Sequence, residues 1–330
     1  MRAMVLEGPG QPLRLRSLPE PDIARGQVLI KVETCAVCRT DLHLLDGELA
    51  DIPYPVIPGH QVVGAVVESR AESLPPGRRV GVPWLGYTCT RCRYCRDGQE
   101  NLCDNAGFTG YTLPGGYAEY LAADARYCFP VDRTASATAL APLLCGGLIG
   151  FRALNMCADA DQIGLYGFGS AAHILAQIIR FQGRSFHAFT RPEDSDAMAA
   201  ARSLGAVWAG SSEQMPPHEL DAAIVFAPVG ALVPAALRAV RKGGIVLCGG
   251  IHMSPIPEFP YELLWGERQV RSVANLTRED GRTFLELAAR VPIAAMTEVF
   301  PLAAANEALQ RLRRGEITGS AVLSVASESA

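Results

Sequence analysis

The segment Cys38–His43 combines a thiol, a cation, a hydroxyl, a carboxylate and an imidazole within six residues. Farther along lie Gly59-His60 and, in an apolar segment, Cys145. Two cysteines and one histidine suit a catalytic zinc, which takes three protein ligands and keeps its fourth position open. These residue types therefore predict a zinc site at Cys38, His60 and Cys145.

Three residues beside these ligands would support zinc chemistry. Asp41 is the carboxylate expected to orient the His60 imidazole, and Thr40 and His43 are expected to move a proton. The alternative is structural, because a lone cysteine is usually a small buried hydrophobe and Cys145 lies in the apolar run Ala-Pro-Leu-Leu-Cys-Gly-Gly. The open spacing of the three ligands does not decide between these interpretations.

A second group of cysteines is much more compact, with Cys89, Cys92 and Cys95 followed after seven residues by Cys103. Four thiolates in one short loop can close a tetrahedral zinc site at about 2.3 Å per bond, and the metal would deprotonate all four thiols. Such a closed site is structural, because it holds a segment too polar to fold by burial. A disulfide pair or chance clustering is the alternative, and the spacing favours zinc.

A third pattern is the strand, glycine-rich turn and helix of a dinucleotide site. The run 162–166 predicts a strand, and residues 174–179 carry apolar side chains at helical spacing. Between them lies Gly167-Phe168-Gly169-Ser170-Ala171-Ala172. Gly167 permits the tight turn, Gly169 lets the backbone approach a pyrophosphate at the helix N-terminus, and Ala172 replaces the third glycine.

The elements around these motifs divide the chain in two. Residues 28–32 and 62–67 predict short strands among Pro- and Gly-rich turns, so the first part is expected to be β-rich. From about residue 147 strands alternate with helices, and further apolar strands at 222–226 and 244–248 predict a doubly wound parallel sheet. A length of 330 residues is sufficient for two domains.

Composition excludes several classes of protein. The chain is 49% hydrophobic and 19% charged, which argues against disorder, and its net charge of -4 suggests no nucleic-acid or membrane surface. The N-terminus MRAMVLEGPG lacks the apolar core of a signal peptide. Ten cysteines without an export signal indicate a reducing, cytoplasmic location, where clustered thiols are metal ligands rather than disulfides.

In this order, the motifs resemble those of the zinc-dependent alcohol dehydrogenases of the medium-chain dehydrogenase/reductase family. The resemblance covers essentially the whole chain and rests on residues 38–43, 59–60, the four-cysteine loop, 141–145, 167–172 and 243–244. It implies a GroES-like catalytic domain over 1–146 and 275–330, carrying the structural zinc lobe. It also implies a Rossmann dinucleotide-binding domain over 147–274, and a homo-oligomer, either a dimer or a tetramer.

The resemblance implies reversible oxidation of a small alcohol to an aldehyde or ketone, with NAD(P) as hydride acceptor and two zinc ions per chain. Thr40 would take the alcohol proton, and His43 would be the outer end of a relay through the cofactor ribose. Arg39 would contact the pyrophosphate. Trp84 falls where the family lines its substrate pocket, with an ordinary core tryptophan as the alternative. Backbone contacts to the cofactor are implied at Ala227, Pro228, Gly249, Gly250, Ala274 and Asn275.

Cofactor choice is indicated by the strand expected at residues 185–191. An NAD-binding chain generally places Asp or Glu at the end of this strand, where the carboxylate binds the ribose 2′-hydroxyl. Here Thr190 and Arg191 stand in that place, and both could bind a 2′-phosphate, the Arg through a charge-assisted fork. The sequence therefore favours NADP(H). A surface arginine beside a promiscuous adenosine pocket is the alternative.

Two positions depart from the family pattern. Many relatives carry Glu after Gly-His, paired with an Arg near the C-terminus, and the aligned positions here are Gln61 and Ser320. Losing both partners is physically sensible, because removing only one from a buried pair costs about 3–5 kcal/mol.

Two other functions remain. One is a zinc-free quinone or enoyl reductase, which the intact ligand set disfavours. The other is a non-catalytic dinucleotide-binding protein, which Thr40 and His43 disfavour.

Overall fold

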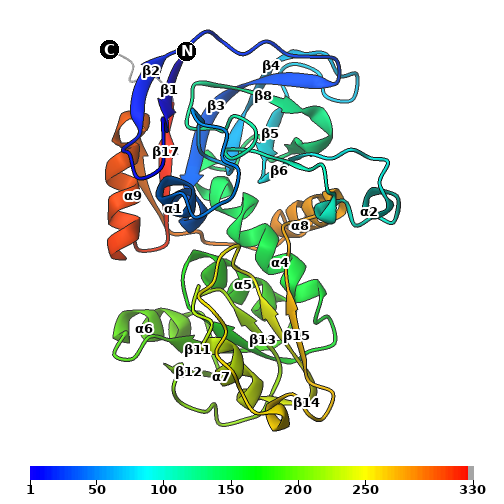
Figure 1. Cartoon of the computed structure of the whole chain (residues 1–330), viewed down its shortest axis with the longest axis vertical. Helices are drawn as coiled ribbons and strands as arrows, with labels where there is room; N and C mark the ends of the chain where they lie inside the picture. Colours follow the sequence, from blue (N-terminus) through cyan, green and yellow to red (C-terminus); the bar gives the residue numbers. More distant parts are fainter. Residues whose placement is uncertain (326–330) are drawn as a thin grey trace. The chain divides into compact units, whose positions relative to one another are not determined.

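The computed structural model describes residues 1–325, which form two compact units, each with its own sheet (Figure 1). The first unit comprises Met1–Cys145, Asn275–Ala289 and the chain from Ala294 onward. The second comprises Gly146–Ala274 and Arg290–Ile293. The chain therefore leaves the first unit after Cys145, builds nearly all of the second and returns at Asn275, and only Arg290–Ile293 joins the second unit again.

The first unit is built on a seven-stranded sheet around β3, which pairs antiparallel with β4, β8 and β17. Its strands are β3 (Gln27–Val37), β4 (Val62–Ser69), β5 (Arg79–Val82), β8 (Tyr120–Asp124), β9 (Phe129–Pro130), β16 (Thr297–Pro301) and β17 (Ser320–Ser324). Two small sheets join β1 (Arg2–Val5) to β2 (Arg14–Ser17), and β6 (Leu85–Tyr87) to β7 (Gly107–Phe108).

Short helices connect these strands. They are α1 (Arg39–Asp46), α2 (Arg93–Arg96), α3 (Ala137–Leu140), α8 (Arg278–Ala288) and α9 (Ala305–Arg314), with 3₁₀ turns η1 (Glu100–Leu102), η2 (Ala125–Tyr127), η3 (Ala141–Leu144) and η5 (Leu302–Ala304). The predicted strands at 28–32 and 62–67 are confirmed, but β3 runs on to Val37. Its continuation Cys35–Val37 is buried on both faces, so it lacks the alternation that marks a strand in sequence.

The second unit is a six-stranded parallel sheet in the order β12-β11-β10-β13-β14-β15 (Figure 1). The predicted strands and the predicted helix at 174–179 are confirmed. The strands are β10 (Gln162–Tyr166), β11 (Ser185–Thr190), β12 (Trp208–Ser211), β13 (Leu220–Val225), β14 (Val240–Cys248) and β15 (Gln269–Ser272). The helices are α4 (Gly146–Asn155), α5 (Ser170–Phe181), α6 (Ser195–Ser203) and α7 (Leu232–Ala239), with η4 (Tyr261–Leu263).

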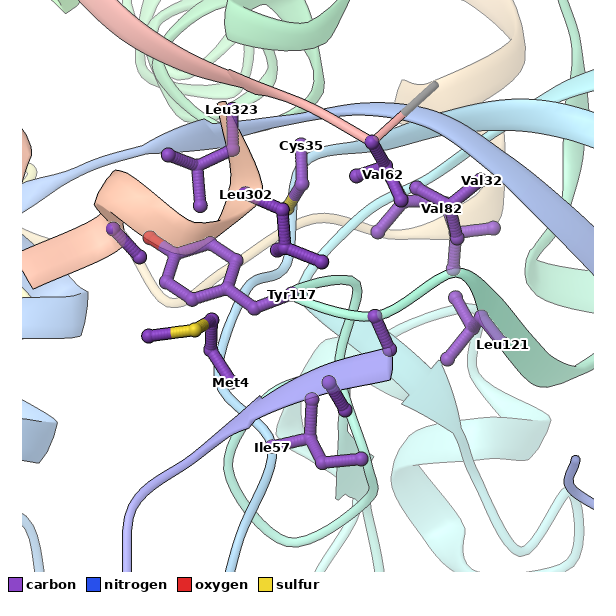
Figure 2. Close-up of a cluster of buried hydrophobic side chains, with 14 of the residues drawn as sticks. Met4, Val32, Cys35, Ile57, Val62, Val82, Tyr117, Leu121, Leu302 and Leu323 are labelled. Atoms are coloured by element: carbon purple, nitrogen blue, oxygen red, sulfur yellow. The ribbon is translucent and has the colours of Figure 1, made fainter. Parts of the chain in front are cut away.

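The core of the first unit brings together residues that are distant in the sequence. Figure 2 shows Met4 of β1, Cys35 of β3, Leu302 of η5 and Leu323 of β17 around the ring of Tyr117.

Within residues 1–325 no single helix has the length and apolar character needed to cross a membrane. The bent pair Ala137–Leu144 and Gly146–Asn155 meets those two criteria together.

One ion pair attaches the four-cysteine loop to a distant helix of the same unit. Glu100 of η1 accepts hydrogen bonds from the backbone N–H and from Nε of Arg278, the first residue of α8, both at 3.0 Å. The Glu100 side chain is 7% exposed and that of Arg278 is 31% exposed. Because a buried carboxylate depends on its donors, this contact fixes one side of the loop.

Replacing Glu100 with alanine should therefore destabilise the first unit. Hydrogen bonds to charged groups contribute about 1.5–3 kcal/mol each. Solvent screens part of this contribution, because Arg278 is partly exposed. We therefore expect the free energy of unfolding, measured in urea, to fall by about 2–4 kcal/mol. The control is Glu279→Ala, which removes an exposed pair with Arg282 and should cost much less, because solvent screens such pairs. Equal effects of the two variants would contradict this role for Glu100.

Candidate active site and dinucleotide-binding turn

The N-terminus of α1 places a ligand and its supporting groups within one turn. Cys38 is the residue that caps the helix: its Sγ accepts the N–H of Thr40 at 3.3 Å, and its own N–H donates to Asp41 Oδ2 at 2.8 Å. The Cys38 sulfur also accepts the backbone N–H of Asp41, so Cys38 and Asp41 form a reciprocal capping box. Since the helix begins where β3 ends, the strand and the cap together fix the position of the Cys38 thiol.

The structure brings the three predicted ligands of the open site together. Cys38 Sγ lies 3.2 Å from His60 Nε2, and the ligand atoms of Cys38, His60 and Cys145 all lie within 4.8 Å of one another. His60 precedes β4, and Cys145 follows η3. Two sulfurs and one imidazole nitrogen at this separation can all reach a single metal ion.

A buried carboxylate lies behind the imidazole. Asp41 Oδ1 is 3.4 Å from His60 Nδ1, and these side chains are 2% and 1% exposed. The separation is too long for a strong hydrogen bond, and His60 Nδ1 has no other partner within residues 1–325. The direction of the contact, with Nδ1 toward Asp41 and Nε2 toward the thiols, is the one that a metal-binding histidine requires.

The charges of this cluster suit a cation. Burial lowers the pKa of His60, but the negative charges of Cys38 and Asp41 outweigh burial and raise it to about 10. A hydrogen bond from Cys145, followed by the charge of His60, holds the pKa of the Cys38 thiol well below its usual value. A bound cation would balance the negative charges of Cys38 and Asp41 that raise the pKa of His60. The donor set therefore fits zinc.

The two predicted relay residues lie on the same face of α1. Thr40 and His43 are three positions apart, which makes them neighbours on a helix surface; both are half-buried. His43 Nδ1 contacts the carboxylate of Glu48. Glu48 lies beyond the helix, past the left-handed Gly47, so helical spacing could not have predicted this partner. Arg39 is exposed at the first position of α1.

Trp84 lies beside the open cluster. Its ring meets that of His60 edge-on, with centroids 4.9 Å apart and planes at 85°. Phe108 and Tyr111 stack on it at 5.4 and 5.6 Å and are 6.1 Å from each other. The three rings are nearly parallel, with interplanar angles of 16–25°, and form one aromatic group. The sequence did not identify Phe108 and Tyr111, because nothing in their spacing links them to residue 84.

The four cysteines of the loop also converge. Their sulfurs all lie within 4.8 Å of one another, with Cys89–Cys103 and Cys92–Cys95 both at 3.5 Å. The N–H groups of Arg91 and Cys92 point at Cys89 and lower its pKa to about 6, whereas burial raises that of Cys95 to about 12. Sulfurs that receive N–H donors are prepared for the thiolate state in which they bind metal.

The predicted cofactor contacts of the second unit lie at one edge of its sheet. Gly167 follows β10 with φ +88°, and a Cβ there would come within 2.9 Å of Ala227 Cβ. Gly169 caps α5, and a Cβ on it would meet no atom within 4 Å. The helix N-terminus is therefore open to an anion. The other predicted positions of this turn and of the neighbouring strand ends are Phe168, Ser170, Ala171, Ala227, Pro228, Gly249 and Gly250.

The end of β11 is less open to a phosphate than the sequence suggests. The Thr190 hydroxyl, 4% exposed, donates to backbone carbonyls of Arg191 and Gly210 at 3.0 and 3.4 Å. Arg191 is 83% exposed and pairs with Asp194 at 3.2 Å.

The last two predicted cofactor contacts are Ala274 and Asn275. They mark the point where the chain passes from the second unit to the first, and Asn275 has a left-handed φ of +57°.

Comparisons with known proteins complete this description. The family model "Alcohol dehydrogenase GroES-like domain" matches residues 24–133. The probable alcohol dehydrogenase AdhA of Mycobacterium tuberculosis is 43% identical over 322 residues, which cover 94% of this chain and 92% of that protein. An alcohol dehydrogenase of Geobacillus stearothermophilus is 32% identical over 344 residues, covering 98% and 100%. The chain is a medium-chain alcohol dehydrogenase.

Solved structures of alcohol dehydrogenases and reductases share its fold. The acetophenone reductase of Geotrichum candidum in complex with NAD superposes with a TM-score of 0.88 at 25% identity, covering 99% of this chain and 98% of that one. The expected combination of a GroES-like domain and a Rossmann sheet is thus confirmed. This alcohol dehydrogenase is an oxidoreductase that transfers a hydride between an alcohol and a nicotinamide cofactor.

The two departures from the family pattern are both buried in this alcohol dehydrogenase. Gln61 is 3% exposed and Ser320 is 6% exposed. Gln61 Nε2 has no hydrogen-bond partner in the described chain, and the backbone N–H of Ser320 donates to Met296 at 2.9 Å. Neither position carries a charge, so neither adds to the negative potential of Cys38 and Asp41.

Proposed function

We propose that this alcohol dehydrogenase uses a catalytic zinc held by Cys38, His60 and Cys145. The observation that supports it most is the convergence of these ligand atoms within 4.8 Å, with Asp41 behind His60. Two thiolates and an imidazole suit zinc and leave its fourth position for substrate. When bound, the zinc would act as a Lewis acid toward the alcohol or carbonyl oxygen.

The protein's own groups would move the proton. The hydride takes two electrons from the alcohol carbon to the nicotinamide, so the hydroxyl proton must leave separately. We assign the Thr40 hydroxyl as the first acceptor and His43 as the outer end of the relay. Glu48, in contact with His43 Nδ1, would stabilise the imidazolium that forms when the proton arrives. Trp84, whose ring meets that of His60 edge-on, would position the carbon part of the substrate.

We further propose a second, structural zinc at Cys89, Cys92, Cys95 and Cys103. Their sulfurs form a closed set within 4.8 Å in a loop whose cysteines are mostly half-buried. A set of four thiolates leaves no position for substrate. Its role would be to hold the loop in place, together with the contact between Glu100 and Arg278.

For the cofactor we propose a preference for NADP(H). Arg191 supports it, because its pair with Asp194 is solvent-exposed and such pairs contribute only about 0–1 kcal/mol, so a 2′-phosphate could displace Asp194. No carboxylate ends β11 where NAD-binding chains usually carry one. Thr190 contributes less than the sequence suggested, because its hydroxyl is already bonded to the backbone.

The remaining proposals concern the setting of the enzyme. We propose small-molecule alcohols and aldehydes as its substrates. A cytoplasmic location is supported by its ten cysteines, all of which are free. A homo-oligomer, a dimer or a tetramer, is supported by Tyr261 and Trp265, each 66% exposed, since large exposed apolar side chains mark interaction surfaces when they gather.

Metal content tests the zinc assignment. Purified active enzyme should contain two zinc ions per chain. Cys38→Ser should abolish turnover, followed as NAD(P)H absorbance with a panel of alcohols and aldehydes, while the fold is retained. Cys92→Ser should lower stability and expose the Cys89–Cys103 loop to proteolysis. Cys248→Ser, outside both clusters, should keep both ions. One zinc or none in fully active protein would contradict the assignment.

The relay predicts a pH-dependent defect. His43→Ala should slow alcohol oxidation near neutral pH by at most about 10²-fold, the low end of general acid–base effects, because water partly replaces the imidazole. The loss should shrink at high pH, where hydroxide can take the proton. Glu48→Gln should cause a smaller loss with the same pH dependence. A loss in His43→Ala that does not vary with pH would indicate a packing role instead.

Cofactor preference follows from kcat/KM with NADPH and NADH. A hydrogen bond to a charged group contributes about 1.5–3 kcal/mol, which corresponds to about a 10- to 150-fold preference for NADPH. Arg191→Ala should abolish that preference. Asp194→Asn, which keeps an oxygen to cap α6 but removes the competing charge, should increase it. A wild type that prefers NADH, or an unchanged ratio in Arg191→Ala, would show that Arg191 does not bind the phosphate.

A further inference from the structure

Tyr117 is a fully buried tyrosine of the first unit whose hydroxyl the fold does not require. Its ring packs with Met4, Cys35 and Leu302 in the apolar core (Figure 2), and a phenylalanine would fill the same space. The hydroxyl has no hydrogen-bond partner among residues 1–325. Because a buried hydroxyl without a partner is unfavourable, its presence needs a physical reason.

The ring of Tyr117 covers the backbone turn that presents His60. The N–H groups of residues 115–117 donate to the carbonyls of residues 57–59 at 2.8–3.0 Å. Gly59 has φ +96°, and a Cβ there would lie 2.3 Å from ring carbon Cδ1 of Tyr117. The aromatic ring therefore occupies the space of the missing side chain and prevents the turn before His60 from moving toward it.

Tyr117 and Asp41 are buried on either side of the same short segment, because the Tyr117 ring packs against Gly59 and the Asp41 carboxylate lies 3.4 Å from His60 Nδ1. Burial raises the pKa of the phenol well above its ordinary value, and the negative charge of Asp41 raises it further. Asp41 is 2% exposed and receives one strong hydrogen bond, from the Cys38 N–H at 2.8 Å, besides its longer contact with His60. A buried carboxylate is stable when it accepts two or three hydrogen bonds, so it has capacity for another donor.

We propose that Tyr117 is a positioning residue of the metal site: its ring holds the turn before His60, and its hydroxyl donates to Asp41 through one buried water. Asp41 then keeps the His60 imidazole in the orientation that binds metal. The inference rests on the proposed function, because it needs a metal ion at Cys38, His60 and Cys145. Removing a group that helps to orient a metal ligand typically lowers the affinity of the protein for the metal 10- to 100-fold.

Tyr117→Phe tests the proposal, because it keeps the ring and deletes only the hydroxyl. The zinc affinity of the three-ligand site, measured by competition with a chromophoric chelator, should fall about 10- to 100-fold. The four-cysteine site of the same molecule should retain its zinc and so serves as an internal control. Tyr166→Phe, which removes an equally buried hydroxyl from the second unit, should leave both affinities unchanged. In cobalt-substituted protein only Tyr117→Phe should shift the visible spectrum.

A double-mutant cycle decides whether the hydroxyl acts through Asp41. In an Asp41→Asn background, Tyr117→Phe should change zinc affinity by clearly less than it does alone, because the carboxylate it would orient is gone. Fully additive effects would overturn the proposal. So would an unchanged affinity in Tyr117→Phe, or loss of zinc from both sites, which would show a role in folding. Wild-type protein that binds no zinc at the three-ligand site would overturn the proposed function instead.

Discussion

The reciprocal hydrogen bonds between Cys38 and Asp41 are the interaction on which the site depends. They begin α1 directly after the central strand, and each residue also has a second role: Cys38 as a ligand and Asp41 as the carboxylate behind His60. Cysteine is not among the residues that usually cap helices. Here the sulfur that accepts the N–H of Thr40 also has its pKa lowered, chiefly by the hydrogen bond from Cys145 and then by the charge of His60, so the atom that caps the helix is also the one prepared to bind metal.

The two cysteine clusters solve the problem of gathering negative charge in different ways. At the open site, half-buried Cys38 lies beside buried His60 and Asp41, and the charges of these groups shift one another's pKa. At the four-cysteine loop, backbone N–H groups stabilise Cys89 without deep burial. The first arrangement relies on neighbouring charges of opposite sign, and the second lets a surface loop acquire a rigid shape that its polar residues could not give it.

Much of the fold and of the candidate site could be predicted from the sequence, because residue types and their local spacing indicate it. The strand, turn and helix around Gly167 and the compact cysteine loop lie within short segments, whereas the helix that Cys38 caps was not predicted. The contacts that the sequence could not supply join segments that meet only in the folded chain. Examples are Glu100 with Arg278, Tyr117 beside Asp41, and Phe108 against Trp84. Thr190 shows another limit: the sequence predicts that its hydroxyl binds a phosphate, but a backbone carbonyl already accepts from that hydroxyl.

The pairing of β17 with β3 has a consequence for synthesis on the ribosome. Val37, at the end of β3, is paired with Ala321, so the strand that leads to Cys38 lacks one neighbour until nearly the whole described chain has emerged. The second unit is almost continuous between Gly146 and Ala274 and can fold first. Closing so long a loop is slow, and until then an edge of β3 stays exposed to wrong strand partners. The nascent first unit is therefore the part that would benefit most from a chaperone.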